Sequence, residues 1–338
     1  MKKFLTKLFA GLLSLTAVFG LAACNGEDKG DGKVKASFYT PDGAPALAIA
    51  KMIDGDKEVS YNVVKANTIA TFVTGEEPKA DFCILPITAA SKLLGTGEKY
   101  TMLATVTHGN LYLLSSDAKQ YDEAAKLGQL ANKAIGVFQP ENVPGLTFEA
   151  LLKGAGVNYK YTRSETIAND LNGQVGLIDK SLDTTEFAAI LEAEPTVTKL
   201  MQESANTAKP LQIVGDIQKL YGDGNGFPQA VLVVKNAFLN EHEDWVKSYL
   251  TKFENSIKAL NETTDMTKIV SALNGVRTEG LEPAITTDNM SAEVLQRCNV
   301  KFVSAANSKA AVTSYLSDLK NVKENAVKDV ADKFFYVG

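Results

Sequence analysis

Arginine, histidine and cysteine are scarce in this chain of 338 residues, which contains three arginines, two histidines and three cysteines. The histidines are His108 and His242, and the cysteines that follow Cys24 are Cys83 and Cys298. Zinc sites need such ligands grouped a few residues apart, and these four side chains are scattered along the chain. The sequence therefore predicts no metal site and no cofactor.

Positive charge is also in short supply, with 35 basic against 40 acidic residues. Residues 1–23 hold three of the basic residues and none of the acidic ones, so the rest of the chain has 32 basic and 40 acidic residues and a formal charge of −8. A nucleic-acid partner is not expected, because binding to phosphates requires a basic surface. After residue 23 no stretch approaches the roughly 18 apolar residues of a transmembrane helix.

The first 23 residues have the pattern of a secretory signal. Three lysines (Lys2, Lys3 and Lys7) precede an apolar run over residues 8–23. A charged start, a short apolar segment and small residues at its end are typical of a removable signal peptide. Residues 24–35 are polar and rich in glycine, which predicts a flexible tether.

The junction Leu21–Ala22–Ala23–Cys24 resembles the lipobox of bacterial lipoproteins. In that family the signal is cleaved before the cysteine, which then carries lipid. The resemblance implies an exported protein that is lipid-anchored through Cys24 on the outer face of the cytoplasmic membrane, or facing the periplasm. Each buried methylene of a lipid chain contributes about 0.8 kcal/mol, so several chains anchor a folded domain firmly. The alternative is an ordinary signal peptide with an incidental cysteine.

A strand, a proline-framed loop and a helix are predicted over residues 36–53. An apolar run over 36–39 is followed by a turn that contains Pro41 and Gly43, and Pro45 stands where a helix would begin. Proline fits the first turn of a helix because its missing amide has no partner there. Ligands of open α/β sheets bind at the carboxyl ends of strands. The alternative is a plain connection without a ligand.

Residues 134–152 repeat this plan, with Pro140 and Pro144 at the spacing of Pro41 and Pro45. Two such units predict two similar α/β lobes that face each other across a cleft. We expect the first lobe to comprise residues 36–108 and 236–338 and the second to comprise residues 109–235. Successive strand–loop–helix units predict mostly parallel sheets with flanking helices. Apolar segments also predict strands at 157–162 and 175–178, a helix at 165–172 and an amphipathic helix at 238–260.

Side chains near the predicted loops and crossovers are the candidate ligand contacts. From the first lobe and the crossover they are Tyr39, Thr40, Asp42, Asn67, Thr88, His108 and Asn110, and from the second lobe they are Phe138, Gln139, Asn142, Arg163 and Phe227. The acidic and amide side chains of Asp42 and Asn142 equally fit a role in capping their own turns.

Several segments together resemble the solute-binding lipoproteins of ABC importers, in the nitrate, sulfonate and thiamine-precursor branch with the type II periplasmic-binding fold. They are the lipobox, the Pro41–Asp42–Gly43–Ala44–Pro45 loop, the stretch 187–195, and the C-terminal segments 300–303 and 334–336. The resemblance implies a monomer that closes about a hinge on a small ligand and delivers it to a membrane permease. Enzymes of menaquinone and thiamine biosynthesis share this fold, so an enzyme is the alternative, although such enzymes need no lipid anchor.

The sequence also bears on the ligand's charge. Strong anions are usually bound by arginine or lysine, and only Arg163 among the three arginines is predicted near the cleft, since Arg277 and Arg297 fall in the C-terminal covering region. Asp42, Glu141 and Glu194 in the loops would repel an anion. The aromatic and amide candidates suit a small neutral or weakly charged heterocycle. Cys83 lies in an apolar run, which favours a buried free thiol over a disulfide with Cys298.

Overall fold

The computed structural model describes residues 34–130, 135–157 and 187–338, and Val34–Gly338 form one compact unit. The predicted signal peptide, Cys24, most of the tether and Arg163 lie outside the described residues. So do residues 158–162 of the strand predicted at 157–162, the strand predicted at 175–178 and the helix predicted at 165–172. In the part of the chain that the structure describes, no helix is long and apolar enough to cross a membrane.

Six strands form the first sheet, in the order β10-β4-β9-β3-β1-β2. β1 runs parallel to β2 and β3, whereas β9 is antiparallel to both β3 and β4, and β10 is antiparallel to β4. The strands are β1 (Ala36–Pro41), β2 (Val59–Val64), β3 (Phe82–Pro86), β4 (Tyr100–Thr107), β9 (Ala230–Lys235) and β10 (Val300–Ser304).

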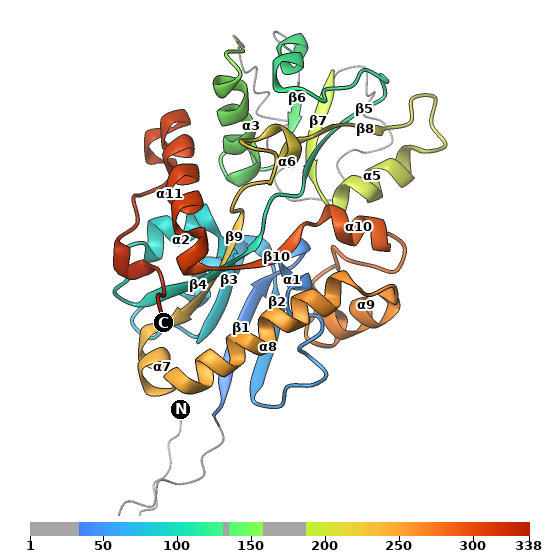
Figure 1. Ribbon diagram of the computed structural model, residues 1–338. Coiled ribbons are helices and arrows are strands. Elements are labelled where there is room, and N and C mark those ends of the chain that lie inside the picture. Colours follow the sequence, from blue (N-terminus) through green and yellow to red (C-terminus); the bar gives the residue numbers. More distant parts are fainter. Residues whose placement is uncertain (1–33, 131–134, 158–186) are drawn as a thin grey trace, which may run out of the picture. The chain divides into compact units, whose positions relative to one another are not determined.

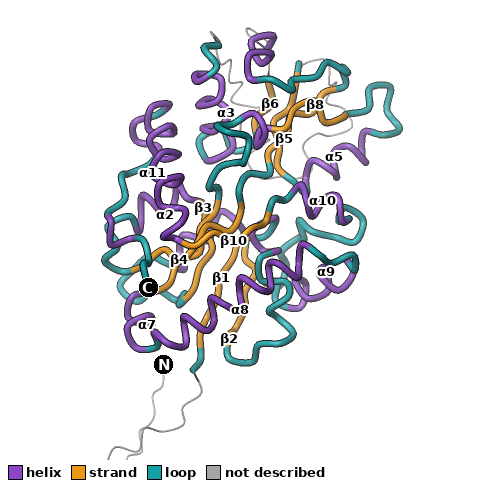
Figure 2. Tube along the Cα trace, viewed as in Figure 1, coloured by secondary structure: helices purple, strands orange, loops and turns teal. Residues whose placement is uncertain are grey.

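Four strands form the second sheet, in the order β6-β7-β5-β8. β6 and β7 are parallel, and β5 is antiparallel to both β7 and β8. Their bounds are β5 (Leu111–Ser115), β6 (Ile135–Val137), β7 (Ala189–Ala193) and β8 (Gln212–Asp216). Figures 1 and 2 show the strands of the two sheets as separate groups.

The predicted α/β class with two sheets is confirmed, but the sheets are mixed rather than mostly parallel. The prediction also assigned residues 230–235 to the second lobe, whereas β9 lies in the middle of the first sheet, between β4 and β3. The segment 230–234 is buried throughout. An apolar run of this kind predicts a buried strand without indicating its direction or its sheet, which explains both errors.

Helices cover both faces of the first sheet. α2 and α11 pack in one apolar core, and α1, α8, α9 and α10 pack in the other. The helices of this part are α1 (Ala44–Leu47), η1 (Ala66–Phe72), α2 (Ile87–Leu94), α7 (Asn236–Glu241), α8 (Glu243–Asn261), α9 (Met266–Gly275), α10 (Ala292–Arg297), α11 (Ala305–Val322), η3 (Glu324–Ala326) and η4 (Asp332–Phe334). Beside the second sheet are η2 (Ala124–Leu130), α3 (Val143–Gly154), α5 (Thr196–Ser204) and α6 (Ile217–Leu220).

The predicted amphipathic helix at 238–260 is present with an interruption at His242, where the backbone leaves the helical region between α7 and α8. Its apolar stripe is core, as predicted: Tyr249, Phe253 and Ile257 are buried. The ring of Tyr249 packs on Phe82 of β3 at a centroid distance of 5.0 Å, which fixes α8 against the first sheet.

The second proline-framed unit is confirmed as strand, loop and helix, whereas in the first unit the helix is the single turn α1, and turns follow it instead of a helix to residue 53. Pro45 lies in the first turn of α1 after β1, and Pro144 lies in the first turn of α3 after β6. Cys83 and Cys298 are buried and unpaired, as predicted.

Candidate functional site

One edge of each sheet carries most of the candidate residues. β1, β2, β3 and β4 all end at the same edge of the first sheet, because β9 is antiparallel to both β3 and β4. In the second sheet β6 and β7 end at the edge where β5 begins. Residues 108–110 lead directly from the end of β4 to the start of β5, and residues 217–229 return from β8 to β9 (Figure 2).

His108 lies where three chain segments meet. Its backbone carbonyl accepts hydrogen bonds from the side-chain amide of Asn299 at 2.7 Å and from the amide of Phe227 at 3.3 Å. Its backbone amide donates to the carbonyl of Asn299 at 3.1 Å. The segment 107–110, the returning segment 226–229 and the start of β10 are therefore joined at this residue.

Burial lowers the pKa of His108 to about 4, and the nearby Lys301 acts in the same direction. The imidazole is therefore uncharged at neutral pH, and its Nε2 is 2.9 Å from the hydroxyl of Thr105. Nδ1 is buried without a partner among the described residues. A neutral ring with one free nitrogen can accept or donate a single hydrogen bond.

The candidates from the first sheet differ in their exposure. Tyr39 is half-buried and stacks on Phe72 with ring centroids 4.3 Å apart. Thr40 and Thr88 are buried, at the end of β1 and in the first turn of α2. Asn67 is exposed on η1. Of these four residues, Tyr39 and Asn67 thus present accessible surface in this arrangement.

Asp42 is fully engaged within the protein. Its carboxylate accepts from the amides of Gly43 at 2.9 Å and Ala284 at 2.8 Å, and it forms an ion pair with Arg277. Both side chains of the ion pair are more than nine-tenths buried. The contacts of Asp42 therefore agree with the alternative in which this side chain structures its own loop. Arg277 lies at this loop and not in a C-terminal region remote from it.

The candidates beyond β6 lie together on one loop. Phe138 and Gln139 are half-buried, and Asn142 is exposed at the start of α3 without capping the helix through its side chain. Gln139 has φ of 43°, and its carbonyl accepts from the amide of Asn142 at 3.0 Å. This tight turn presents the loop at the edge of the second sheet.

Phe227 belongs to the core. It is 1% exposed and stacks on Tyr315 of α11 at a centroid distance of 5.4 Å. Asn110 is buried as well, and its side-chain amide donates to the carbonyl of Glu194 at 2.7 Å. Neither side chain is exposed for a ligand in this arrangement.

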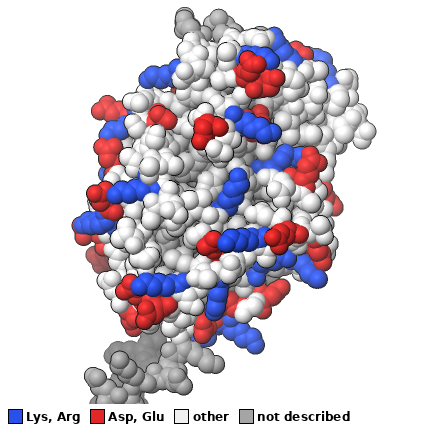
Figure 3. All heavy atoms as spheres, in the orientation of Figure 1, with Lys and Arg blue, Asp and Glu red and all other residues white. Residues whose placement is uncertain are grey.

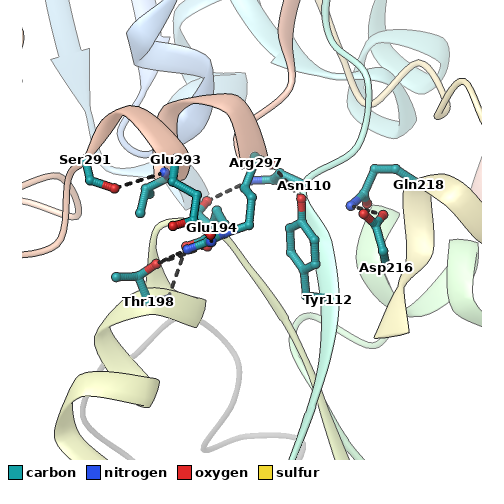
Figure 4. A network of polar contacts seen from close by, with 10 residues as sticks. Asn110, Tyr112, Glu194, Thr198, Asp216, Gln218, Ser291, Glu293 and Arg297 are labelled. Carbon is teal, nitrogen blue, oxygen red and sulfur yellow. Dashed lines mark hydrogen bonds and ion pairs between the residues drawn. The ribbon is translucent and has the colours of Figure 1, made fainter. Parts of the chain in front are cut away.

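An ion-pair network that the sequence does not indicate lies between the two sheets, and Figure 4 shows it from close by. Nε of Arg297, at the end of α10, donates to Glu194 at 2.6 Å, and Nη2 donates to the hydroxyl of Thr198 at 2.9 Å. Glu194 follows β7 and its side chain is fully buried. The prediction that Glu194 would repel an anion is thus weakened, because Arg297 neutralises it.

Several buried polar atoms near the two edges have no partner among the described residues. They are the side-chain oxygens of Thr107, Asn110 and Gln229, together with Nδ1 of His108 and Nη2 of Arg277, whose Nη1 is ion-paired with Asp42. Glu192, on β7, is 4% exposed and accepts from the amide of Ala193 at 2.8 Å. Burial raises the pKa of Glu192 to about 8. Uncharged acceptors and a protonated carboxyl suit a ligand that has N–H and C=O groups.

A pocket of about 500 Å³ lies elsewhere, between α3, α11 and the turn after α6. Leu151, Tyr221 and Asp318 are among its lining residues, and none of the candidate ligand residues lines it.

Within the described part of the chain, no group of three or more His, Cys, Asp or Glu side chains is arranged to hold a metal ion. Figure 3 shows lysine and arginine interspersed with acidic residues over the face in view.

Comparison with solved structures identifies this architecture. A protein described as an ABC transporter from Parabacteroides distasonis is 18% identical, with a TM-score of 0.66 over 90% of this chain and 99% of its own. The periplasmic nitrate-binding protein NrtA from Synechocystis PCC 6803 is 11% identical, with a TM-score of 0.60 over 90% and 84%. This is the fold of the periplasmic binding proteins.

The alkanesulfonate-binding protein SsuA from Xanthomonas axonopodis pv. citri, solved with MOPS bound, also has the periplasmic-binding-protein fold. It is 12% identical, with a TM-score of 0.54 over 88% of this chain and 96% of its own. The resemblance that the sequence indicated is thereby confirmed in its fold, and identities this low establish the fold alone. No protein-family model and no curated protein matches the chain.

Proposed function

We propose that this protein is an extracytoplasmic solute-binding lipoprotein of an ABC importer. It binds one small polar ligand between the edges of its two sheets and delivers that ligand to a permease in the membrane. The periplasmic-binding-protein fold carries this proposal. The signal-like start of the chain and the Leu21–Ala22–Ala23–Cys24 junction support export and lipid anchoring through Cys24.

The ligand proposed is neutral or weakly charged, and a heterocycle fits best. Two of the three arginines are paired with buried carboxylates, Arg277 with Asp42 and Arg297 with Glu194. An arginine that is already paired is a poor partner for a strong anion, because the ligand must displace the carboxylate. This observation supports the preference over nitrate or a sulfonate.

Aromatic side chains and unpartnered polar atoms support the same ligand class. Tyr39 and Phe138 are half-buried, one at the edge of each sheet, and suit stacking on a planar ring. The unpaired side-chain oxygen of Gln229, a half-buried residue just before β9, suits the polar rim of such a ring.

The proposed mechanism is closure about the junction at His108. The ligand docks at one edge, and the two sheets then approach each other, so that both edges contact it. A ligand shifts such an equilibrium only through its stronger binding to the closed form. The proposed lobes meet at the two connections 108–110 and 217–229, with β9 belonging to the first sheet.

An enzyme on the same fold is the second candidate. His108 is buried with its ring bonded to Thr105, and it is uncharged at neutral pH, which favours a structural role over acid–base catalysis. The predicted lipid anchor favours the binding protein as well.

Calorimetric titration of residues 24–338 with a panel of vitamins, nucleobases, amino acids, sulfonates and nitrate tests the ligand class. We expect tight binding of one heterocycle and none of nitrate or sulfonate. Tight binding of a sulfonate or of nitrate alone, abolished by Arg163→Ala, would overturn it.

Anchoring is tested separately by fractionating cells that express the wild type or Cys24→Ser. We expect the wild type with the membranes and the variant released. Equal release of both would show that Cys24 is not lipidated.

A further inference from the structure

α10 contacts the second sheet through Arg297, its last residue. Arg297 stands three positions before β10 of the first sheet, and Glu194 links β7 to α5 beside the second sheet. Nε of Arg297 donates to Oε1 of Glu194 at 2.6 Å. The backbone carbonyl of Arg297 accepts from the hydroxyl of Tyr112, on β5, at 3.2 Å. Residues far apart in the sequence thus tie the two sheets together.

The polar groups of this contact satisfy one another. The hydroxyl of Thr198 donates to Oε1 of Glu194 at 3.0 Å and accepts from Nη2 of Arg297 at 2.9 Å. Oε2 of Glu194 accepts from the amide of Thr198 at 3.1 Å, in the first turn of α5. Nη1 of Arg297 donates to Glu293, one turn earlier on α10, at 2.5 Å. All three guanidinium nitrogens are therefore engaged, as Figure 4 shows.

Burial makes the contact strong. The side chain of Glu194 is fully buried and that of Arg297 is 19% exposed. Removal of Arg297 alone would leave this carboxylate buried without a partner, which is strongly unfavourable. One turn further along α5, Gln202 donates to the carbonyl of Asp288 at 2.8 Å, so α5 is tied to the segment before α10 at a second place.

We propose that Arg297, Glu194 and Thr198 form a latch beside the junction at His108, since Glu194 is also bonded to Asn110 of that junction. The latch holds the two sheets in the arrangement described here, which the proposal takes as the ligand-gripping one, and it breaks when the sheets rotate about the junction. The latch sets the fraction of ligand-free molecules that are already closed. It rests on the hinge closure proposed above. The apparent affinity for the ligand is proportional to the fraction of molecules that are already closed. Loss of the latch therefore weakens ligand binding without removing any contact to the ligand.

Arginine is required in this role. A lysine retains the charge but not the planar group that reaches Glu194, Thr198 and Glu293 together. Thr198→Val removes only the hydroxyl that joins the two charged groups. The two variants therefore grade the latch without leaving an unpaired buried charge.

The test measures the separation of the sheets in the absence of any ligand. Spin labels are placed on Asn206→Cys, before β8, and on Lys252→Cys, on α8, because both positions are exposed. Cys24 is replaced by serine, and Cys83 and Cys298 are fully buried. Electron–electron resonance distances are then compared for wild type, Arg297→Lys, Arg297→Ala and Thr198→Val. The matched control is Lys258→Ala, which removes an exposed ion pair within α8.

We expect longer and broader distances for Arg297→Ala and a smaller shift of the same sign for Arg297→Lys and Thr198→Val. The control should match the wild type. If Arg297→Ala does not fold, the two milder variants decide the question. Unchanged distances in all the folded Arg297 and Thr198 variants would overturn the latch.

The same labels separate the latch from the proposed function. If the spin-label distances change in the latch variants but do not change when any solute of the calorimetric panel is added, the latch is supported and solute binding is not. If a heterocycle from the panel closes the wild type, its apparent Kd should rise about tenfold in a variant whose closed fraction falls tenfold.

Discussion

Substitution of Gly226 by alanine tests the junction at His108 directly. Gly226 has φ of 88°, and a Cβ atom built there would lie 2.1 Å from the carbonyl oxygen of His108. That oxygen accepts hydrogen bonds from Asn299 at 2.7 Å and from Phe227 at 3.3 Å. Gly222, in the same loop, has φ of 58° and open space where its Cβ would be, and it provides the matched control.

The magnitude follows from the difference between the two glycines. Alanine at either position adopts a left-handed backbone, which costs about 1–2 kcal/mol. At Gly226 the methyl group must also push the segment away from His108 and weaken two hydrogen bonds, each contributing about 1 kcal/mol. Gly226→Ala should therefore destabilise the protein by roughly 2 kcal/mol more than Gly222→Ala.

Urea unfolding followed by circular dichroism measures this difference, as a lower midpoint at unchanged slope. Equal losses of stability in Gly226→Ala and Gly222→Ala would refute the close approach of the two connections. A changed slope would instead show that the variant alters the compactness of the folded or unfolded state.

Three further predictions concern buried groups. Burial raises the pKa of Glu192 to about 8, so the folded state retains a proton that the unfolded state releases at lower pH. The free energy of unfolding should accordingly fall by up to about 2 kcal/mol as the pH rises from 6.5 to 8, measured by urea unfolding. Glu192→Gln should remove most of this loss, and an equal pH dependence in wild type and variant would show that Glu192 does not carry it. Asp42→Ala should cost about 3–5 kcal/mol because it leaves Arg277 buried without its carboxylate, and a loss below 1 kcal/mol would show that the pair is unimportant. Phe227→Ala should cost about 3–5 kcal/mol as a core truncation, and an unchanged stability would return Phe227 to the ligand contacts.

Between pH 4.5 and 6.5 the slope contributed by Glu192 is opposed by His108. The pKa of His108 is lowered to about 4, so the unfolded state takes up a proton there that the folded state does not. This group stabilises the fold above pH 6.5, and its contribution is lost as the pH falls towards 4. Glu192→Gln leaves the contribution of His108 unchanged, so the difference between the wild type and this variant from pH 6.5 to 8 isolates Glu192.

Local patterns predicted the local structure well. Proline at the start of a helix is a local rule, and both Pro45 and Pro144 obey it. The stripe on α8 is a periodic signal of the same kind, and its residues are buried as predicted. Such features depend on a few neighbouring residues, so a single sequence contains them.

Partners distant in the sequence were not predictable from a single sequence. Arg297 pairs with Glu194, which is 103 positions away, and Arg277 pairs with Asp42. Nothing in the composition of either segment indicates its partner. The prediction that residues 230–235 belong to the second lobe was wrong for the same reason, since the apolar run of β9 fits any buried strand and β9 lies between β4 and β3.

Some of the candidate ligand residues lie on loops at the sheet edges, as Gln139 and Asn142 do. Position after a strand and before a helix indicated them. The same rule also selected Asp42, which is engaged within the protein. The sequence shows that a loop follows a strand. It does not show whether a polar side chain of that loop is already hydrogen-bonded or ion-paired to another part of the fold, as Asp42 is.

Mass spectrometry of the small molecule that co-purifies with the protein tests the central claim most directly. The protein is isolated from membranes without refolding, and the solute is identified before and after prolonged incubation with an excess of the same compound. A binding protein should yield one polar, neutral or weakly charged heterocycle at a one-to-one ratio, and the added compound should be recovered unchanged. Conversion of that compound into a product would contradict the account and would show that the chain is an enzyme.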